Sequence, residues 1–218
     1  CKANDADGIP FSLPREKYTF RNDWIPVIDQ LERPVDAKEV MEFIRSNDKR
    51  TMYDIGMEEP VDYIPTKRIA LPVDKDAAIA SGIVKESDRD LMVDTVYIEL
   101  KKSSLSRSEL MLLDMFANFD WKRPIYFTQA YMLNNFSLVD YLQFDGYAYR
   151  FVPILTPLKD SWEVGRVDAD YAYDVLMNKT KHGGVSNPDV YVDSFMHHNI
   201  MVARTREAFA RVAKQYIM

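Results

Sequence analysis

Cysteine is almost absent from this sequence, which contains only Cys1 among its 218 residues. A single cysteine excludes an internal disulfide and a metal site built on several thiolates. Cys1 itself has two interpretations. We expect it to be an interior position of a longer chain, because residues 1–8 have the composition of a linker and no methionine precedes them. The alternative is the lipid-modified first residue of a lipoprotein, left after removal of a signal peptide.

Glycine is also scarce, with seven residues, and neither GxGxxG nor GxxxxGKS/T occurs. Those loops bind phosphate groups through closely approaching backbone amides, so the sequence predicts no nucleotide and no other cofactor. No apolar run approaches the roughly 20 residues that a membrane-spanning helix needs. We therefore expect this piece of chain to be a soluble domain.

An excess of positive charge is missing too. The chain has 28 Lys and Arg against 34 Asp and Glu, which gives a formal net charge of −6. Proteins that bind nucleic acid cluster their cations against phosphates, and the basic residues here form no long block. Nucleic acid is therefore excluded as an expected partner.

Histidine, the usual acid or base in catalysis, occurs three times. His197 and His198 are adjacent on a predicted helix, so their side chains point about 100° apart and do not form a shared metal site. A structural or surface role is favoured for both. His182 precedes two glycines in a predicted flexible loop. Because no serine or cysteine lies in a nucleophile-elbow context, a hydrolytic triad has little support.

Carboxylates offer one further candidate for chemistry. Asp170 and Asp174 are four residues apart, the spacing at which two carboxylates share one helix face for acid–base work or for a hard cation. Tyr171, Val175 and Leu176 make the same stretch an ordinary amphipathic helix with a solvated face. We favour that second interpretation, and the sequence predicts no catalytic residue and no metal site.

The residues that are abundant point to a folded α/β protein. Hydrophobic residues make up 47% of the chain, enough for a sizeable core. Short apolar runs and alternating patterns predict strands at 24–28, 68–73, 95–101, 125–128 and 147–154. Helices are predicted after caps at Asp36, Asp74, Ser87 and the Ser106–Glu109 capping box, and around 138–142. We predict an α/β or α+β fold with a mixed β-sheet and flanking helices.

Two regions differ from this pattern. Seven of the 11 prolines lie between Pro10 and Pro72, so extended segments and turns are expected in the first third. From Asp189 onward, residues of an apolar stripe recur at helical period, among them Phe195, Phe209, Val212 and Tyr216. The opposite, polar face of this helix carries Arg204, Glu207, Arg211 and Lys214. We therefore predict a mixed α/β domain at 1–188 and a long amphipathic helix at 189–218.

Four residues are candidates for binding a ligand: Trp121, Arg123, Tyr147 and Arg150. Exposed aromatic faces can stack on sugars, and arginine can bind an anionic glycan or a lipid phosphate. Each residue also has a structural interpretation, which we favour. Trp121 can close the end of the preceding helix, and both arginines can pair with buried carboxylates.

Several segments resemble a known group of proteins, in the same order along nearly the whole chain. They include the motifs RIALPVDK, WKRPIYF and YLQFDG, and they lie at 10–18, 34–44, 68–75, 108–114, 121–127, 141–146 and 149–154. The chain resembles the region after the transmembrane part of large bacterial membrane proteins of unknown function. Those proteins are related to the protein O-mannosyltransferases, which are glycosyltransferases of the C type.

This resemblance implies a parent protein whose membrane spans and acidic residues would transfer sugar from a lipid-linked donor. No catalytic residue of that family falls on this chain, so an enzyme label would belong to the parent alone. The resemblance further implies the extracytoplasmic, periplasmic side of the inner membrane. It implies a tetratricopeptide-like character for the helix at 199–218. The membrane-embedded remainder of the same polypeptide is then an expected partner.

The sequence thus supports two leading hypotheses. The first is a non-catalytic accessory domain that positions an acceptor protein, a glycan or a lipid-linked sugar. The alternative is a structural module for protein–protein interaction. A free-standing metal-dependent or hydrolytic enzyme is the third.

Overall fold

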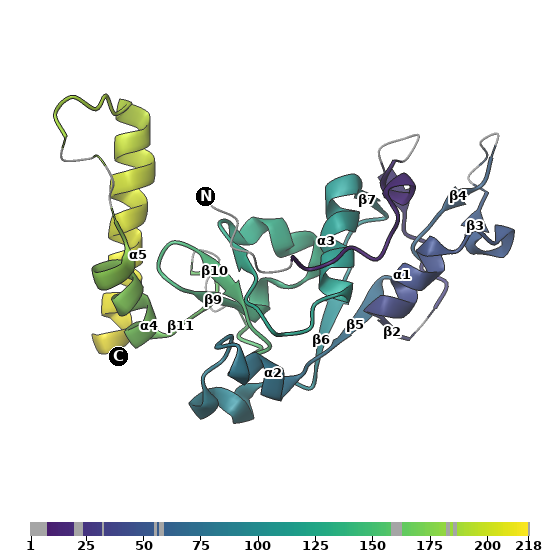
Figure 1. Ribbon diagram of the computed structural model, residues 1–218, viewed down its shortest axis with the longest axis horizontal. Helices are drawn as coiled ribbons and strands as arrows, with labels where there is room; N and C mark the ends of the chain where they lie inside the picture. The colour runs from purple at the N-terminus through teal and green to yellow at the C-terminus, as the bar shows by residue number, and fades with distance from the viewer. Residues whose placement is uncertain are drawn as a thin grey trace. The chain divides into compact units, whose positions relative to one another are not determined.

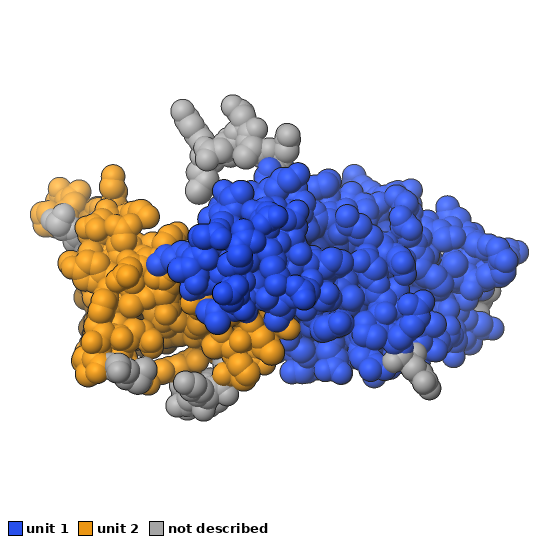
Figure 2. Space-filling view, turned by 90° about the horizontal axis from the view of Figure 1, so that it is seen from below, with its two compact units in different colours: residues 1–123, 133–138 blue, residues 124–132, 139–218 orange. Residues whose placement is uncertain are grey.

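The computed structural model describes residues 8–19, 24–31, 33–54, 56, 59–157, 163–181, 184 and 187–217. Cys1 and His182 lie outside the described residues. The chain divides into two compact units, coloured separately in Figure 2. Unit 1 comprises 1–123 and 133–138, and unit 2 comprises 124–132 and 139–218. The division predicted at 188/189 is a different one and stays a prediction.

The central sheet of unit 1 has three strands, in the order β2 (Val35–Asp36), β5 (Arg68–Pro72) and β6 (Thr95–Glu99). β5 runs parallel to β2 and antiparallel to β6. Ile98 of β6 is fully buried whereas Tyr97 is exposed, which confirms the alternation in the sequence. Pro72, which lacks an amide proton, ends the central strand and does not lie at an edge of the sheet.

Two antiparallel strand pairs complete the strands described in unit 1. β1 (Trp24–Pro26) pairs with β7 (Ser104–Ser106), and β3 (Met52–Tyr53) pairs with β4 (Val61–Asp62). The mixed α/β class is therefore confirmed in this unit, with both parallel and antiparallel pairing.

Three helices of unit 1 begin at predicted caps. Asp36 caps α1 (Ala37–Arg45), Asp74 caps α2 (Lys75–Ala80), and the Ser106–Glu109 capping box starts α3 (Arg107–Ala117). α1 packs against β5 and α3 (Figure 1). The prediction for Ser87 is wrong, because the 3-10 helix Glu86–Leu91 begins one residue earlier and encloses it.

One buried carboxylate fastens the N-terminal segment to α3. Asp114, which is fully buried, accepts hydrogen bonds from the amides of Ser12 and Leu13 at 2.9 and 3.1 Å. The hydroxyl of Tyr18 and the side-chain amide of Asn118 also donate to it. Burial, followed by the hydrogen bond with Asp114, raises the pKa of Tyr18. The extended start of unit 1 is thus held by side-chain contacts to a helix.

Unit 1 is completed by residues that follow a segment of unit 2. Leu133, Phe136 and Leu138 are fully buried. The side-chain amide of Asn135 donates to Glu109 at 2.7 Å. The two units are therefore interleaved along the sequence, because 124–132 belong to unit 2 whereas 133–138 return to unit 1.

Unit 2 contains a four-stranded sheet in the order β11 (Arg166–Val167), β9 (Leu142–Phe144), β10 (Tyr149–Phe151) and β8 (Tyr126–Phe127). β9 and β10 form an antiparallel hairpin, and β11 runs parallel to β9. The sequence assigned 138–142 to a helix. The structure has only the short 3-10 helix Val139–Tyr141 there, directly followed by β9.

Two helices cover this sheet in unit 2. α4 (Ala169–Asp174) continues into a π-helical turn at Val175–Lys179, and α5 (Ala203–Ile217) follows a π-helical segment at Met196–Val202. α4 and α5 lie side by side (Figure 1). Their shared core consists of Phe144, Ala172, Leu176, Ala208 and Val212. No helix among the described residues is long and apolar enough to cross a membrane.

The predicted faces of the last helix need a correction. Val212 is buried as expected, but Phe195, Phe209 and Tyr216 of the same predicted apolar stripe are exposed. Arg211, placed on the polar face by the sequence pattern, is buried. The buried face of this helix therefore includes Arg211 as well as Val212. It is rotated about the helix axis from the face that the sequence predicts.

Candidate functional site

Unit 2 contains a pocket of about 270 Å³, which we call the aromatic pocket. It is lined by Thr128, Gln129, Ala130, Tyr131, Phe144, Gly146, Tyr147, Tyr149, Arg204 and Glu207. Four of these ten residues are aromatic, and two carry opposite charges. The pocket therefore combines apolar ring faces with strong hydrogen-bonding groups in a small volume.

Three parts of unit 2 supply its walls. The segment after β8 provides residues 128–131, and α5 provides Arg204 and Glu207. The β9–β10 hairpin provides Phe144, Gly146, Tyr147 and Tyr149. Arg204 and Glu207 are three residues apart, so they lie on the same face of the helix. The site is thus assembled from segments that are far apart in the sequence.

The floor of the pocket is a packed aromatic pair. The ring centres of Phe144 and Tyr149 lie 5.5 Å apart. The guanidinium carbon of Arg211 lies 4.0 Å from the centre of the Phe144 ring. Arg211 also donates hydrogen bonds to the carbonyls of Val164 and Gly165 at 2.6 and 3.3 Å. This buried arginine therefore joins the Phe144 ring to the loop that precedes β11.

The hairpin turn fixes the position of Tyr147. Gly146 has a φ of +99°, and a Cβ atom added there would lie 3.2 Å from Cδ2 of Leu176. This glycine lies in the tight turn between β9 and β10, and the position has little room for a side chain. The Tyr147 hydroxyl is hydrogen-bonded to that of Thr205 at 3.0 Å, which ties the turn to α5.

The remaining polar groups are available to a ligand. Arg204 and Glu207 are exposed, and neither forms an ion pair or hydrogen bond with another residue in the described part of the chain. Tyr131 is 67% exposed and Tyr147 is 36% exposed. Two exposed tyrosines and two opposite charges therefore lie at one pocket.

The four residues predicted to bind a ligand divide between the two units. Trp121 and Arg123 belong to unit 1, and Tyr147 and Arg150 belong to unit 2. Trp121 is only 2% exposed, and its indole N–H donates to the carbonyl of Pro72 at 2.9 Å. Arg123 is half-buried. Their roles in binding stay predictions.

Trp121 also borders a larger depression in unit 1, with a volume of about 710 Å³. Its charged lining comprises Lys38, Asp74, Lys75, Asp76, Arg89, Asp94, Asp120 and Lys122. Lys75 pairs with Asp94 at 2.7 Å, and Arg89 pairs with Asp76 at 2.9 Å. These charges mostly neutralise one another at an exposed surface.

Arg150 lies at the centre of a buried network in unit 2. Its Nε donates to Asp145 at 2.7 Å, and the side-chain amide of Gln143 donates to the other carboxylate oxygen at 3.0 Å. Its guanidinium carbon lies 4.5 Å from the centre of the Tyr171 ring and 5.9 Å from that of Tyr126. Burial, followed by a hydrogen bond with Tyr171, raises the pKa of Tyr126. These contacts match the structural interpretation of Arg150, the pairing with a buried carboxylate.

The other candidates for chemistry also have local partners. Asp170 accepts a hydrogen bond from the Tyr216 hydroxyl at 2.8 Å, and Asp174 pairs with Lys179 at 2.7 Å. His198 is exposed, and its Nδ1 lies 2.9 Å from the carbonyl of Ser194. No group of three or more potential metal ligands occurs among the residues that the structure describes.

Sequence reasoning singled out only Tyr147 of the exposed groups at the aromatic pocket. Tyr131, Arg204 and Glu207 were missed as site residues, because nothing in their local patterns distinguishes them from surface residues. Only the packing of α5 near the β9–β10 hairpin brings the helix residues together with Tyr131. The nearest signal in the sequence was the high aromatic content around these strands.

One comparison with known families gives a match. The family model described as TMEM260-associated domain 2 matches residues 1–171. This range covers unit 1, the sheet of unit 2 and the first half of α4, and it ends before α5. No curated protein and no solved structure matches the chain.

Proposed function

The chain belongs to the TMEM260-associated domain 2 family, and from this premise we propose that it is a non-catalytic accessory domain of a membrane glycosyltransferase-like protein. TMEM260 is a protein O-mannosyltransferase-like protein. The domain acts on the extracytoplasmic side and positions the acceptor polypeptide or the lipid-linked sugar. Its partner is the membrane-embedded remainder of the same polypeptide.

The aromatic pocket is the observation that supports this proposal. Its open groups are suited to hold a polar organic molecule, because exposed tyrosine rings lie beside a guanidinium and a carboxylate that have no polar partner among the described residues. Such a surface contributes binding and orientation, and the reacting groups are then supplied elsewhere in the parent protein. An accessory domain needs this division of roles.

The isolated chain tests the proposal directly. We expect it to bind glycans or acceptor peptides on arrays without transferring or hydrolysing sugar from a lipid-linked donor. In the full-length parent, Tyr147→Ala and Glu207→Gln should lower the rate of sugar transfer, whereas the exposed control Tyr97→Ala in unit 1 should not. Sugar transfer by the isolated chain would overturn the proposal.

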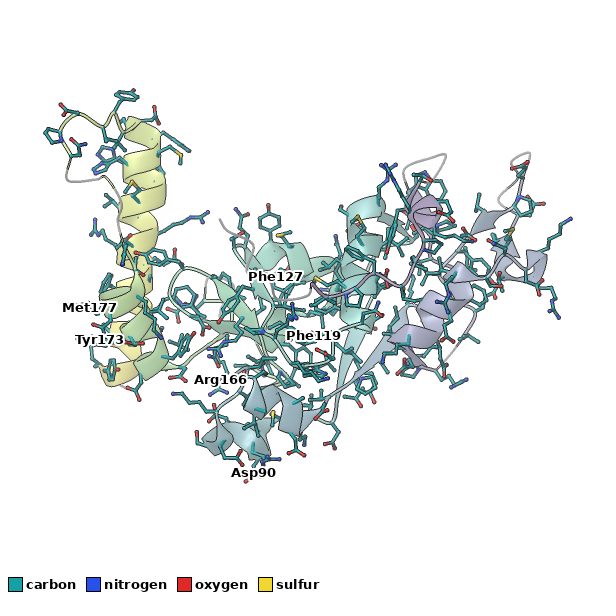
Figure 3. All side chains as sticks on the ribbon, viewed as in Figure 1. Asp90, Phe119, Phe127, Arg166, Tyr173 and Met177 are labelled. Atoms are coloured by element: carbon teal, nitrogen blue, oxygen red, sulfur yellow. The ribbon has the colours of Figure 1, made fainter. Side chains whose placement is uncertain are left out.

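A specific surface favours a second candidate, a module for protein–protein interaction. Figure 3 marks Tyr173 and Met177 on the outer side of the α4–α5 pair, and both are exposed. The Tyr173 ring packs edge-on against the exposed Tyr216, with ring centres 6.4 Å apart. Pulldowns that recover only proteins, and that lose them on Tyr173→Ala with Met177→Ala, would favour this module over the accessory role.

A further inference from the structure

We propose that the aromatic pocket binds a single pyranose ring of a neutral glycan. Tyr131 and Tyr147 stack on the C–H face of the sugar, and Glu207 and Arg204 bond to its hydroxyl groups. This inference rests on the proposed function, because it names the sugar as the ligand of this domain in preference to the acceptor polypeptide.

The size of the pocket fits one small ring. Its volume of about 270 Å³ is just below the range of roughly 300–1,000 Å³ that is usual for drug-sized ligands. A docked helix or an extended peptide would need a longer groove with several side-chain pockets. The aromatic pocket therefore has the dimensions of a subsite for one sugar unit.

The aromatic walls suit the apolar side of a sugar. A pyranose presents polarised C–H bonds on one face and hydroxyl groups around its edge. The face of a tyrosine ring carries negative potential and attracts such positive groups, as it attracts cations. Tyr131 and Tyr147 are exposed to solvent at the pocket, whereas Phe144, which also lines it, is buried.

The charged pair suits the edge of the sugar. A carboxylate such as Glu207 accepts hydrogen bonds at both oxygens, and a guanidinium such as Arg204 donates several from a fixed plane. Because neither group is paired with another described residue, a sugar can bond to both without breaking an internal ion pair. Hydrogen bonds to charged groups are also stronger than those between neutral groups.

The balance of charge selects a neutral ligand. Arg204 would attract a phosphate or a carboxylate, but Glu207, one helical turn away, would repel it. A cation would be attracted by Glu207 but repelled by Arg204. Hydroxyl groups satisfy both side chains without carrying charge, because each hydroxyl both donates and accepts.

Direct binding measurements with simple sugars test this inference. The probes are neutral methyl pyranosides of different configurations, followed by saturation-transfer NMR and titration into the full 218-residue chain. Tyr131→Ala and Tyr147→Ala should each weaken binding of the preferred pyranoside about threefold to tenfold, as expected for loss of one aromatic contact. Glu207→Gln should weaken it about tenfold or more, since a charge-assisted hydrogen bond is lost.

Two variants serve as matched controls. Tyr131→Phe keeps the stacking ring and should retain most of the binding. Tyr191→Ala removes a tyrosine of the same unit that is 89% exposed and outside the pocket, so it should leave binding unchanged. Tyr131 and Glu207 are themselves exposed, so their variants should keep the thermal stability of the parent chain.

The possible failures are distinguishable. The inference would be overturned if no pyranoside shows saturation transfer at millimolar concentration. It would also be overturned if Tyr131→Ala and Glu207→Gln bind the preferred pyranoside as tightly as the parent chain does. If acceptor peptides bind instead and lose affinity on Tyr147→Ala, the inference fails while the proposed accessory function stands. If the isolated chain transfers sugar by itself, the accessory function fails whatever the pocket binds.

Discussion

The guanidinium group of Arg211 lies against the ring of Phe144, with 4.0 Å between the guanidinium carbon and the ring centre. Arg211 also donates to two backbone carbonyls, at Val164 and Gly165. One cation of the last helix thus joins the floor of the aromatic pocket to the loop before β11. Arg211, which the helical pattern places on the surface, is thus part of the core of unit 2.

Replacing Arg211 should lower the stability of unit 2. We expect Arg211→Met to lower the free energy of unfolding by about 2 kcal/mol, because it leaves two carbonyls without their donor and removes the cation–π contact. Chemical denaturation measures the change. Arg206→Met, on the exposed side of the same helix, is the control and should change stability by less than about 0.5 kcal/mol. Equal values for the two variants would contradict a structural role for Arg211.

The carboxylate of Asp114 should be essential for the N-terminal segment. Asp114→Asn replaces one acceptor oxygen by a donor that faces other donors, and we expect a loss of about 3 kcal/mol in unfolding free energy. Hydrogen exchange should accelerate at the amide of Leu13, which donates to this carboxylate. Asp90→Asn changes an exposed carboxylate of unit 1 (Figure 3) and is the matched control. Unchanged exchange at Leu13 would show that other contacts hold the segment.

Glu109 should make the stability of unit 1 depend on acid pH. Burial by itself would raise the pKa of Glu109, but hydrogen bonds from Lys102, Ser106 and Asn135 outweigh it and lower that pKa from 4.5 to about 2. Because the folded-state pKa is depressed, this stability is fully present above pH 4.5 and is lost as the pH falls toward 2. The expected loss is on the order of 2 kcal/mol, measured by denaturation across this window.

The matched variant for this effect is Glu109→Gln. It should be less stable than the parent chain at neutral pH, and its stability should fall less steeply between about pH 5 and pH 2. Parallel stability curves for the two proteins would mean that other carboxylates carry the acid dependence.

A methyl group at Gly146 should disturb the pocket as well as the fold. Gly146→Ala adds backbone strain at positive φ and brings Cβ within 3.2 Å of Leu176, so we expect a loss of about 2 kcal/mol. Gly56→Ala is the control, since its φ is +80° but nothing lies within 4 Å of the added atom. The difference between their unfolding free energies isolates the steric contact, and a zero difference would show that Leu176 moves freely.

The elements that sequence reasoning located are those fixed by near neighbours. Ser106 and Glu109 form a capping box within four residues, and Ile98 and Tyr97 show the burial alternation of a strand with one wet face. Asp74 caps α2 at its predicted start. Each of these signals requires only local backbone chemistry.

The missed features depend on contacts between distant segments. β9 is buried at all three positions, so its sequence has no alternation to separate it from a helix. Arg211 is buried because it packs on the ring of Phe144 and donates to carbonyls in the loop before β11. The helical pattern of the sequence does not contain these contacts. The aromatic pocket was missed for the same reason, since Tyr131 and Glu207 meet only in the folded unit.

Because residues 133–138 belong to unit 1 but follow a segment of unit 2, unit 1 can be completed only late in synthesis of the chain. A ribosome releases the chain from the N-terminus, so unit 1 cannot bury Leu133 and Phe136 until the preceding strand of unit 2 has emerged. A gene fragment that stops after the codon for Arg123 would therefore encode a unit 1 that lacks the buried Leu133 and Phe136. A recombinant fragment that contains all of unit 1 should therefore end after residue 138. Such a fragment also includes the β8 segment of unit 2.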